Sequence, residues 1–162
     1  MTPPAAFRYQ ARVSVAASRI AFVCYAGFLA GVIYLANHGG GRLWSFLTDI
    51  PGGDKLGHLG LVGTLTLLLN LALRGRRAPG KLSRIMLGSL LAATIMTLEE
   101  LSQAMIPPRS LDLFDGLANL AGVALGEWGA KRYLDSRAKA RWKRGTGESN
   151  PIRTGPGASG FP

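Results

Sequence analysis

Ionisable side chains with a capacity for chemistry gather in two short stretches of this 162-residue sequence. Six of the nine Asp and Glu residues lie within residues 49–58 and 99–115, together with Lys55, His58 and Arg109. Histidine and carboxylate side chains can exchange protons with a substrate, and Lys or Arg can hold a phosphate or carboxylate group. These residue types therefore allow acid–base catalysis or the binding of a charged ligand.

Their spacing places several of these side chains on common helix faces. Asp54 and His58 are four residues apart, so on a helix the carboxylate could orient the imidazole. Glu100 and Gln103 are three residues apart and would also be neighbours. At 100° per residue, one further set shares about 80° of a helix surface: Asp112, Asp115, Asn119, Gly122 and Gly126. Two glycines four residues apart allow another helix to approach closely.

The elements that carry these residues are four apolar blocks. Hydrophobic residues make up 48% of the chain and charged residues only 17%, a balance typical of membrane proteins. The blocks cover residues 20–36, 56–73, 85–106 and about 112–130. We therefore predict an all-α, polytopic integral membrane protein, a bundle of four transmembrane helices. A signal peptide is the alternative for the first block, but the run is long for one and further spans follow.

The distribution of positive charge predicts the orientation. Fifteen Lys and Arg residues lie in the N-terminal segment, the second loop and the tail, against three in the first and third loops. By the positive-inside rule both termini are cytoplasmic and the first and third loops face outward. We thus divide the chain into a cytoplasmic segment 1–19, a transmembrane domain 20–133 and a basic, then disordered, cytoplasmic tail 134–162. Orientation, rather than nucleic-acid binding, explains the net charge of +10, and the tail should bind anionic lipids.

Taken together, these motifs resemble those of the VanZ-like membrane proteins. Asp54-Lys55-x-x-His58 is similar to the first motif of the family. The second is matched by Glu100-x-x-Gln103, Pro108-Arg109 and Asp115-x-x-x-Asn119-x-x-Gly122-x-x-x-Gly126. The resemblance implies a multi-pass protein of the bacterial plasma membrane with a role in the cell envelope. One member is associated with low-level glycopeptide resistance, and many have no resistance role.

Three classes of function follow from an outward-facing polar pocket. The protein could bind a lipid-linked or glycan envelope intermediate, or a partner protein, through that pocket. Alternatively, it could be a membrane enzyme acting on a phosphate-bearing lipid-linked substrate, or a structural subunit whose polar network fixes helix packing. In the enzyme, His58, Glu100 and Asp115 would be catalytic. The binding side chains would be Asp54, Lys55, Gln103, Arg109 and Asn119, with Gly122 and Gly126 serving helix packing. We expect no cofactor and no metal, because a zinc site needs more than one well-placed histidine.

Overall fold

The computed structural model describes residues 5–38, 50–103 and 112–145, with side chains described for residues 15–38, 50–102, 112–140 and 142. Within these ranges the chain is helical, apart from turns and one isolated bridge between Arg77 and Met86. The elements are α1 (Ala5–Asn37), α3 (Gly53–Ala72), the short η2 (Gly80–Leu82), α4 (Leu87–Gln103) and α5 (Leu113–Gly145). The all-α prediction is confirmed.

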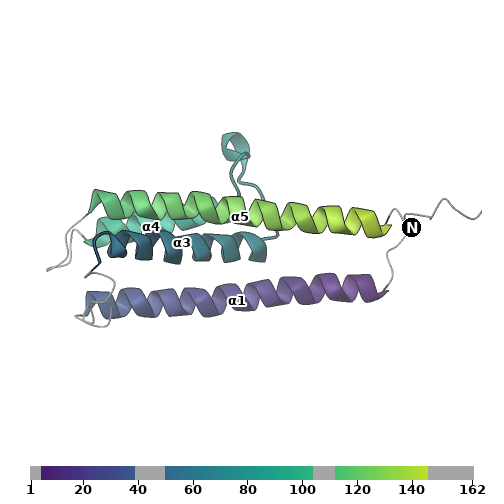
Figure 1. Ribbon diagram of the computed structural model, residues 1–162, viewed down its shortest axis with the longest axis horizontal. Coiled ribbons are helices and arrows are strands. Elements are labelled where there is room, and N and C mark those ends of the chain that lie inside the picture. Colours follow the sequence, from purple (N-terminus) through teal and green to yellow (C-terminus); the bar gives the residue numbers. More distant parts are fainter. Residues whose placement is uncertain (1–4, 39–49, 104–111, 146–162) are drawn as a thin grey trace, which may run out of the picture.

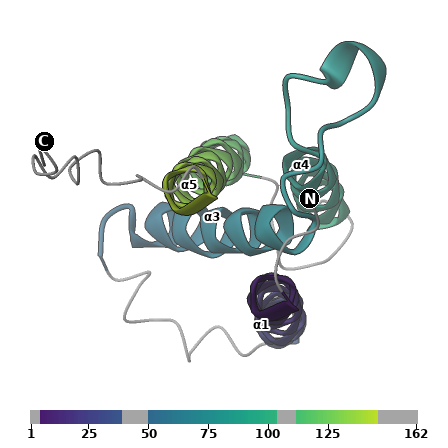
Figure 2. The ribbon, with the colours of Figure 1, turned by 90° about the vertical axis from the view of Figure 1, so that its right-hand side faces the viewer.

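Along the length of the molecule the four long helices alternate in sense (Figure 1), and α3 is inclined to the others (Figure 2). One end of the bundle collects the end of α1, the start of α3, the end of α4 and the start of α5, and we call it the acidic end. At the opposite, basic end, α1 and α5 extend beyond α3 and α4. Viewed along the bundle, α3 lies between α1 and the α4–α5 pair (Figure 2). In the described part of the chain, α1 packs against α3 alone among the helices, whereas α3 packs against all three others.

Local signals fix the helix starts at the acidic end. Gly52 adopts a left-handed backbone with φ of 77°, a conformation that glycine tolerates and that turns the chain into α3. Before α5, the Asp112 carboxylate accepts a hydrogen bond of 2.8 Å from the backbone N–H of Phe114. Asp112 therefore caps α5 by satisfying one of the free amide groups of its first turn. Both starts place charged residues of α3 and α5 at the same level.

Glycine residues bring α3 and α5 into backbone contact. A Cβ atom added to Gly122 would lie 2.7 Å from the carbonyl oxygen of Leu59 and 3.0 Å from the nitrogen of Gly63. One added to Gly126 would clash with the carbonyl of Gly63 and lie 2.8 Å from the Cβ of Thr66. Gly122 and Gly126, the two packing positions predicted from sequence, thus lie against α3. This close approach brings the polar side chains of the two helices within hydrogen-bonding range.

Helix lengths differ from the sequence-based boundaries. Among the residues that the structure describes, two stretches are long and apolar enough to cross a membrane, Val15–Asn37 and Gly53–Ala72. The first helix already begins at Ala5, inside the predicted cytoplasmic segment, and α5 continues to Gly145 without a break at residue 133. No proline interrupts the basic stretch after the apolar part of α5, so the helix continues through it. The residues of α5 therefore change from apolar to basic along the helix, while the helix itself continues.

Candidate functional site

An ammonium group surrounded by carboxylates forms the centre of the acidic end. The Lys55 Nζ atom lies 2.7 Å from Asp54 Oδ2, 3.2 Å from Asp112 Oδ2 and 3.1 Å from Asp115 Oδ1. An ammonium group has three N–H donors, and these three acceptors use all of them. From the sequence, Lys55 is expected to bind a phosphate or carboxylate group of a ligand. In the structure, carboxylates of the protein itself hold it.

The electrostatics of Asp112 follow from this arrangement. The pKa of Asp112, which precedes the first residue of α5, lies below its usual range. The main cause is the hydrogen bond donated by the backbone N–H of Phe114, followed by the hydrogen bond from Lys55. Both favour the charged carboxylate. Asp112 therefore serves as a helix cap and as an ionised partner of Lys55.

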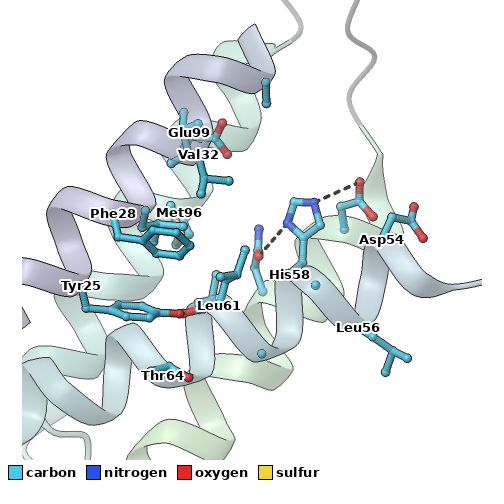
Figure 3. A pocket seen from close by; sticks show the side chains of 18 of the residues that line it. Tyr25, Phe28, Val32, Asp54, Leu56, His58, Leu61, Thr64, Met96 and Glu99 are labelled. Atoms are coloured by element: carbon cyan, nitrogen blue, oxygen red, sulfur yellow. Dashed lines mark hydrogen bonds and ion pairs between the residues drawn. The ribbon is translucent and has the colours of Figure 1, made fainter. Parts of the chain in front are cut away.

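His58 is held by α5 and not by Asp54. Its Nδ1 atom lies 3.1 Å from Asn119 Oδ1, and its Nε2 atom lies 3.6 Å from Asp115 Oδ2 (Figure 3). The prediction that Asp54 orients the imidazole is corrected here, because the Asp54 carboxylate accepts from Lys55. The Lys55 side chain reaches from α3 to Asp115 at the start of α5, and the Asp54 carboxylate lies beside its ammonium group. Asp115 and Asn119, four residues apart on α5, therefore orient the ring.

Glu100 brings α4 into the same cluster. The side chain is only 6% exposed. Its Oε1 atom accepts a 3.3 Å hydrogen bond from the backbone N–H of Asp112. Its Oε2 atom is buried and has no hydrogen-bond partner among the residues that the structure describes. Two other predicted site residues are not placed: Arg109 lies outside the described residues, as does the side chain of Gln103 at the last position of α4.

Three carboxylates of this cluster have the geometry of a potential cation site. Oxygen atoms of Asp54, Asp112 and Asp115 all lie within 4.8 Å of one another. Hard divalent cations prefer carboxylate oxygen ligands, so such a trio can hold a metal. The expectation of no metal rests on the lack of a histidine-based zinc site and does not cover a site made of carboxylates. Because the Lys55 ammonium already lies among these oxygens, a metal ion would have to displace it.

A cavity of about 750 Å³ adjoins the cluster. It lies between α1 and α3, with contributions from α4 and α5, and most of its wall is apolar (Figure 3). Its polar end is formed by Asp54, His58, Glu99, Asp115 and Asn119. Its wall is lined by apolar side chains that include Phe28, Val32, Leu61 and Met96. Tyr25 and Thr64 lie at the end of the cavity that is farther from Asp54 and His58. Phe28 and Leu56 line the cavity yet are 53% and 65% exposed, so the cavity is open to its surroundings.

The sequence predicts a polar pocket at this end, but neither the apolar cavity that adjoins it nor the part that α1 plays in its wall. Two glycines of α3, Gly57 and Gly60, line the space, and a Cβ added to either would meet no atom within 4 Å. Three residues apart, they leave one strip of α3 without side chains. The spacing of these two glycines is the one feature of the sequence that indicates open space beside α3. Nothing in the sequence pairs it with Tyr25 or Phe28 of α1.

A second polar group, also missed, lies between α3, α4 and α5 toward the basic end. Asn70 donates from Nδ2 to Ser89 Oγ at 2.8 Å, and both side chains are fully buried. Nearby, Glu127 accepts from the backbone N–H of Met86 and pairs with Lys131. Thr66 and Asn70 are four residues apart in an apolar helix, and that spacing could have indicated a buried polar face. The contacts of this group link three helices and fix their packing.

Six of the predicted site residues converge at the acidic end: Asp54, Lys55, His58, Glu100, Asp115 and Asn119. They come from three helices and lie next to the cavity, which the imidazole and carboxylate groups border. Comparison of the chain with family models, curated proteins and solved structures gives no match. The site geometry therefore carries the functional argument.

Proposed function

We propose that this chain is a VanZ-like integral membrane protein of the bacterial cell envelope that binds an amphipathic, lipid-linked intermediate in the cavity between α1 and α3. The cavity is the observation that carries the proposal. Its volume falls in the range of small-molecule sites, roughly 300–1,000 Å³, and its wall is apolar with a few convergent polar groups at one end. Such a division of polarity matches a molecule with an apolar chain and a polar headgroup.

Four membrane spans with both termini in the cytoplasm are part of this proposal. Support comes from two helices that are long and apolar enough to cross a membrane. Large apolar side chains also point outward on the other two helices, among them Leu91, Ile95 and Leu98 on α4 and Leu117 and Leu120 on α5. Such a surface is costly in water and favourable in lipid. With the positive charge at the basic end, the cavity's polar end faces outward.

Cysteine labelling tests this orientation. We expect a membrane-impermeant maleimide applied to intact cells to label His38→Cys at the acidic end and to leave Ser83→Cys unlabelled until the membrane is opened. Both positions are exposed, and Cys24→Ser removes the single native thiol. External labelling of Ser83→Cys, with His38→Cys protected, would contradict the proposed topology.

The helical basic stretch of α5 fits contact with anionic lipids at the cytoplasmic surface. The Arg132 guanidinium lies 5.2 Å from the ring centre of Trp128, and that of Arg137 lies 5.1 Å from the ring centre of Tyr133. Exposed aromatic rings beside arginines are typical of the membrane interface. Each basic residue near an anionic surface contributes about 1 kcal/mol to membrane attraction.

An enzyme acting on a lipid-linked substrate is the second candidate, and the His58–Asp115 pair beside the cavity is the observation that favours it. An imidazole next to a carboxylate can act in proton transfer. Among the described side chains, however, no serine, threonine or cysteine is hydrogen-bonded to His58, so we assign no nucleophile. Binding without catalysis is therefore the primary proposal. A purely structural role would leave the cavity without a ligand.

Filling the cavity tests the binding proposal. We expect Gly60→Leu to reduce the amount of co-purifying amphiphile at least tenfold, because a leucine side chain would occupy space that Gly60 leaves open. The measurement is mass spectrometry of lipids extracted from equal amounts of purified protein. Gly27→Leu is the matched control, since Gly27 also has open space around it but does not line the cavity. Equal lipid recovery from both variants and from the unchanged protein would reject the proposal.

A further inference from the structure

Resting on the proposed function, we infer that the amphiphile in this cavity carries an ammonium group in its headgroup, and not a phosphate as its only charge. Three observations support it: the charge around the polar end, the three hydrogen bonds that Lys55 already makes, and a buried oxygen atom of Glu100 that has no hydrogen-bond partner among the described residues. Each points to a cationic headgroup.

Negative charge dominates the polar end of the cavity. Asp54, Glu99 and Asp115 line it directly, and Asp112 and Glu100 lie behind them. In this part of the described structure, Lys55 is the one ammonium group. By sequence the excess persists when the flanking loops are included, with six acidic residues against Arg42, Lys55 and Arg109. Low-dielectric walls strengthen the attraction of such a site for cations.

Lys55 lies among these carboxylates but offers no free N–H group to a negatively charged ligand. Its three N–H donors are all used by Asp54, Asp112 and Asp115, so it has none left for a ligand phosphate. A phosphate entering the cavity would instead meet carboxylates, and like charges at short range repel. An ammonium headgroup would donate hydrogen bonds to the same oxygens.

Glu100 provides an independent observation, a buried acceptor atom without a donor among the described residues. It is more than nine-tenths buried, and its Oε2 atom has no hydrogen-bond partner within the described residues. The other oxygen contacts the backbone N–H of Asp112, so the carboxylate is directed at the cluster. A buried carboxylate oxygen without a donor is costly, and a cation nearby would reduce that cost.

The length of the cavity suits an extended apolar chain. Along α3 the lining runs from Asp54 at the polar end to Thr64, ten residues further on, which is about 15 Å at 1.5 Å per residue. Gly57 and Gly60 leave this strip open, and Phe28, Leu61 and Met96 supply apolar contacts. The chain would lie between α1 and α3, and the ammonium would lie beside Asp115 and Glu99.

Chain-matched probes test the headgroup. Hexadecylamine, hexadecanol and hexadecyl phosphate would be titrated into the full-length protein in a neutral maltoside detergent, with occupancy measured by native mass spectrometry. We expect the amine to bind about tenfold more tightly than the alcohol, because a hydrogen bond between an ammonium and a carboxylate is stronger than one donated by a neutral hydroxyl group. The phosphate, titrated with and without Mg²⁺, should bind more weakly than the alcohol.

Two variants locate the effect. Asp115→Asn and Glu99→Gln should each weaken amine binding about tenfold and leave hexadecanol binding unchanged, consistent with loss of one charged contact. Glu99→Gln keeps the inference testable where Asp115→Asn fails to fold, because Asp115 also holds Lys55. Asp135→Asn is the matched control, since it removes an equal charge from an exposed site on α5 that does not line the cavity.

The outcomes separate this inference from the proposed function. Preferred binding of the alcohol or the phosphate would overturn the ammonium assignment and leave amphiphile binding intact. Phosphate binding that requires Mg²⁺ would also overturn it, and would indicate a metal ion at the Asp54, Asp112 and Asp115 oxygens. Failure of all three probes to bind would reject the proposed function itself.

Discussion

Lys55→Met should lower thermal stability more than any other single charge substitution at the acidic end. Methionine keeps most of the side-chain length but removes the ammonium that Asp54, Asp112 and Asp115 share. Three carboxylates, with oxygens within 4.8 Å of one another, would then repel without compensation. Thermal unfolding of the detergent-purified variant, followed by circular dichroism, measures the effect.

A second substitution shows whether charge causes that loss. Combining Lys55→Met with Asp112→Asn should recover part of the stability, because one of the repelling charges is removed. Lys81→Met is the control, since Lys81 is exposed in the short η2 helix. A Lys55→Met protein as stable as the unchanged chain would show that the cluster contributes nothing to the fold.

Gly126→Ala should destabilise the bundle by about 1–3 kcal/mol, the usual range for an added methyl group in a closely packed interior. The new Cβ would clash with the carbonyl of Gly63 and lie 2.8 Å from the Cβ of Thr66. Backbone atoms cannot move aside as a flexible side chain can, so α5 would have to shift away from α3. The change in unfolding free energy in mixed micelles is the measurement.

The same helix contains a matched control for this substitution. A Cβ at Gly116 would meet no atom within 4 Å. Gly116→Ala should therefore leave stability unchanged or raise it by up to about 1 kcal/mol through helix propensity. If the two alanine variants were equally stable, the close contact between α3 and α5 would be refuted.

Much of the site could be predicted because helical periodicity determines which residues share a face. The spacing of Asp115, Asn119, Gly122 and Gly126 places them on one side of a helix, and in the structure that side faces α3. The apolar run at residues 56–73 likewise predicts a helix, and the structure has one over Gly53–Ala72. Properties that repeat along one helix are therefore readable from the sequence.

The individual contacts between side chains of different helices, and the place of α1, could not be predicted. The i,i+4 spacing of Asp54 and His58 permits a contact, but Lys55 reaches the start of α5 and takes Asp54 as its partner. The cavity depends on α1 lying against α3 at the open strip of Gly57 and Gly60. Helical periodicity does not specify that α1 packs against α3. The two glycines have no side chains, so they also add nothing to the hydrophobic pattern of the sequence.

Photocrosslinking from the cavity wall tests the central claim most directly. A photoreactive benzoyl group introduced at Phe28, which lines the cavity, would be compared with the same group at Val23, which is exposed and lies outside it. Mass spectrometry would identify the molecules captured at each position in native membranes. We predict that position 28 captures one class of amphiphile enriched at least tenfold over its share at position 23, where bulk lipid is captured. Identical lipid composition at the two positions would contradict the claim that this protein binds a specific membrane amphiphile.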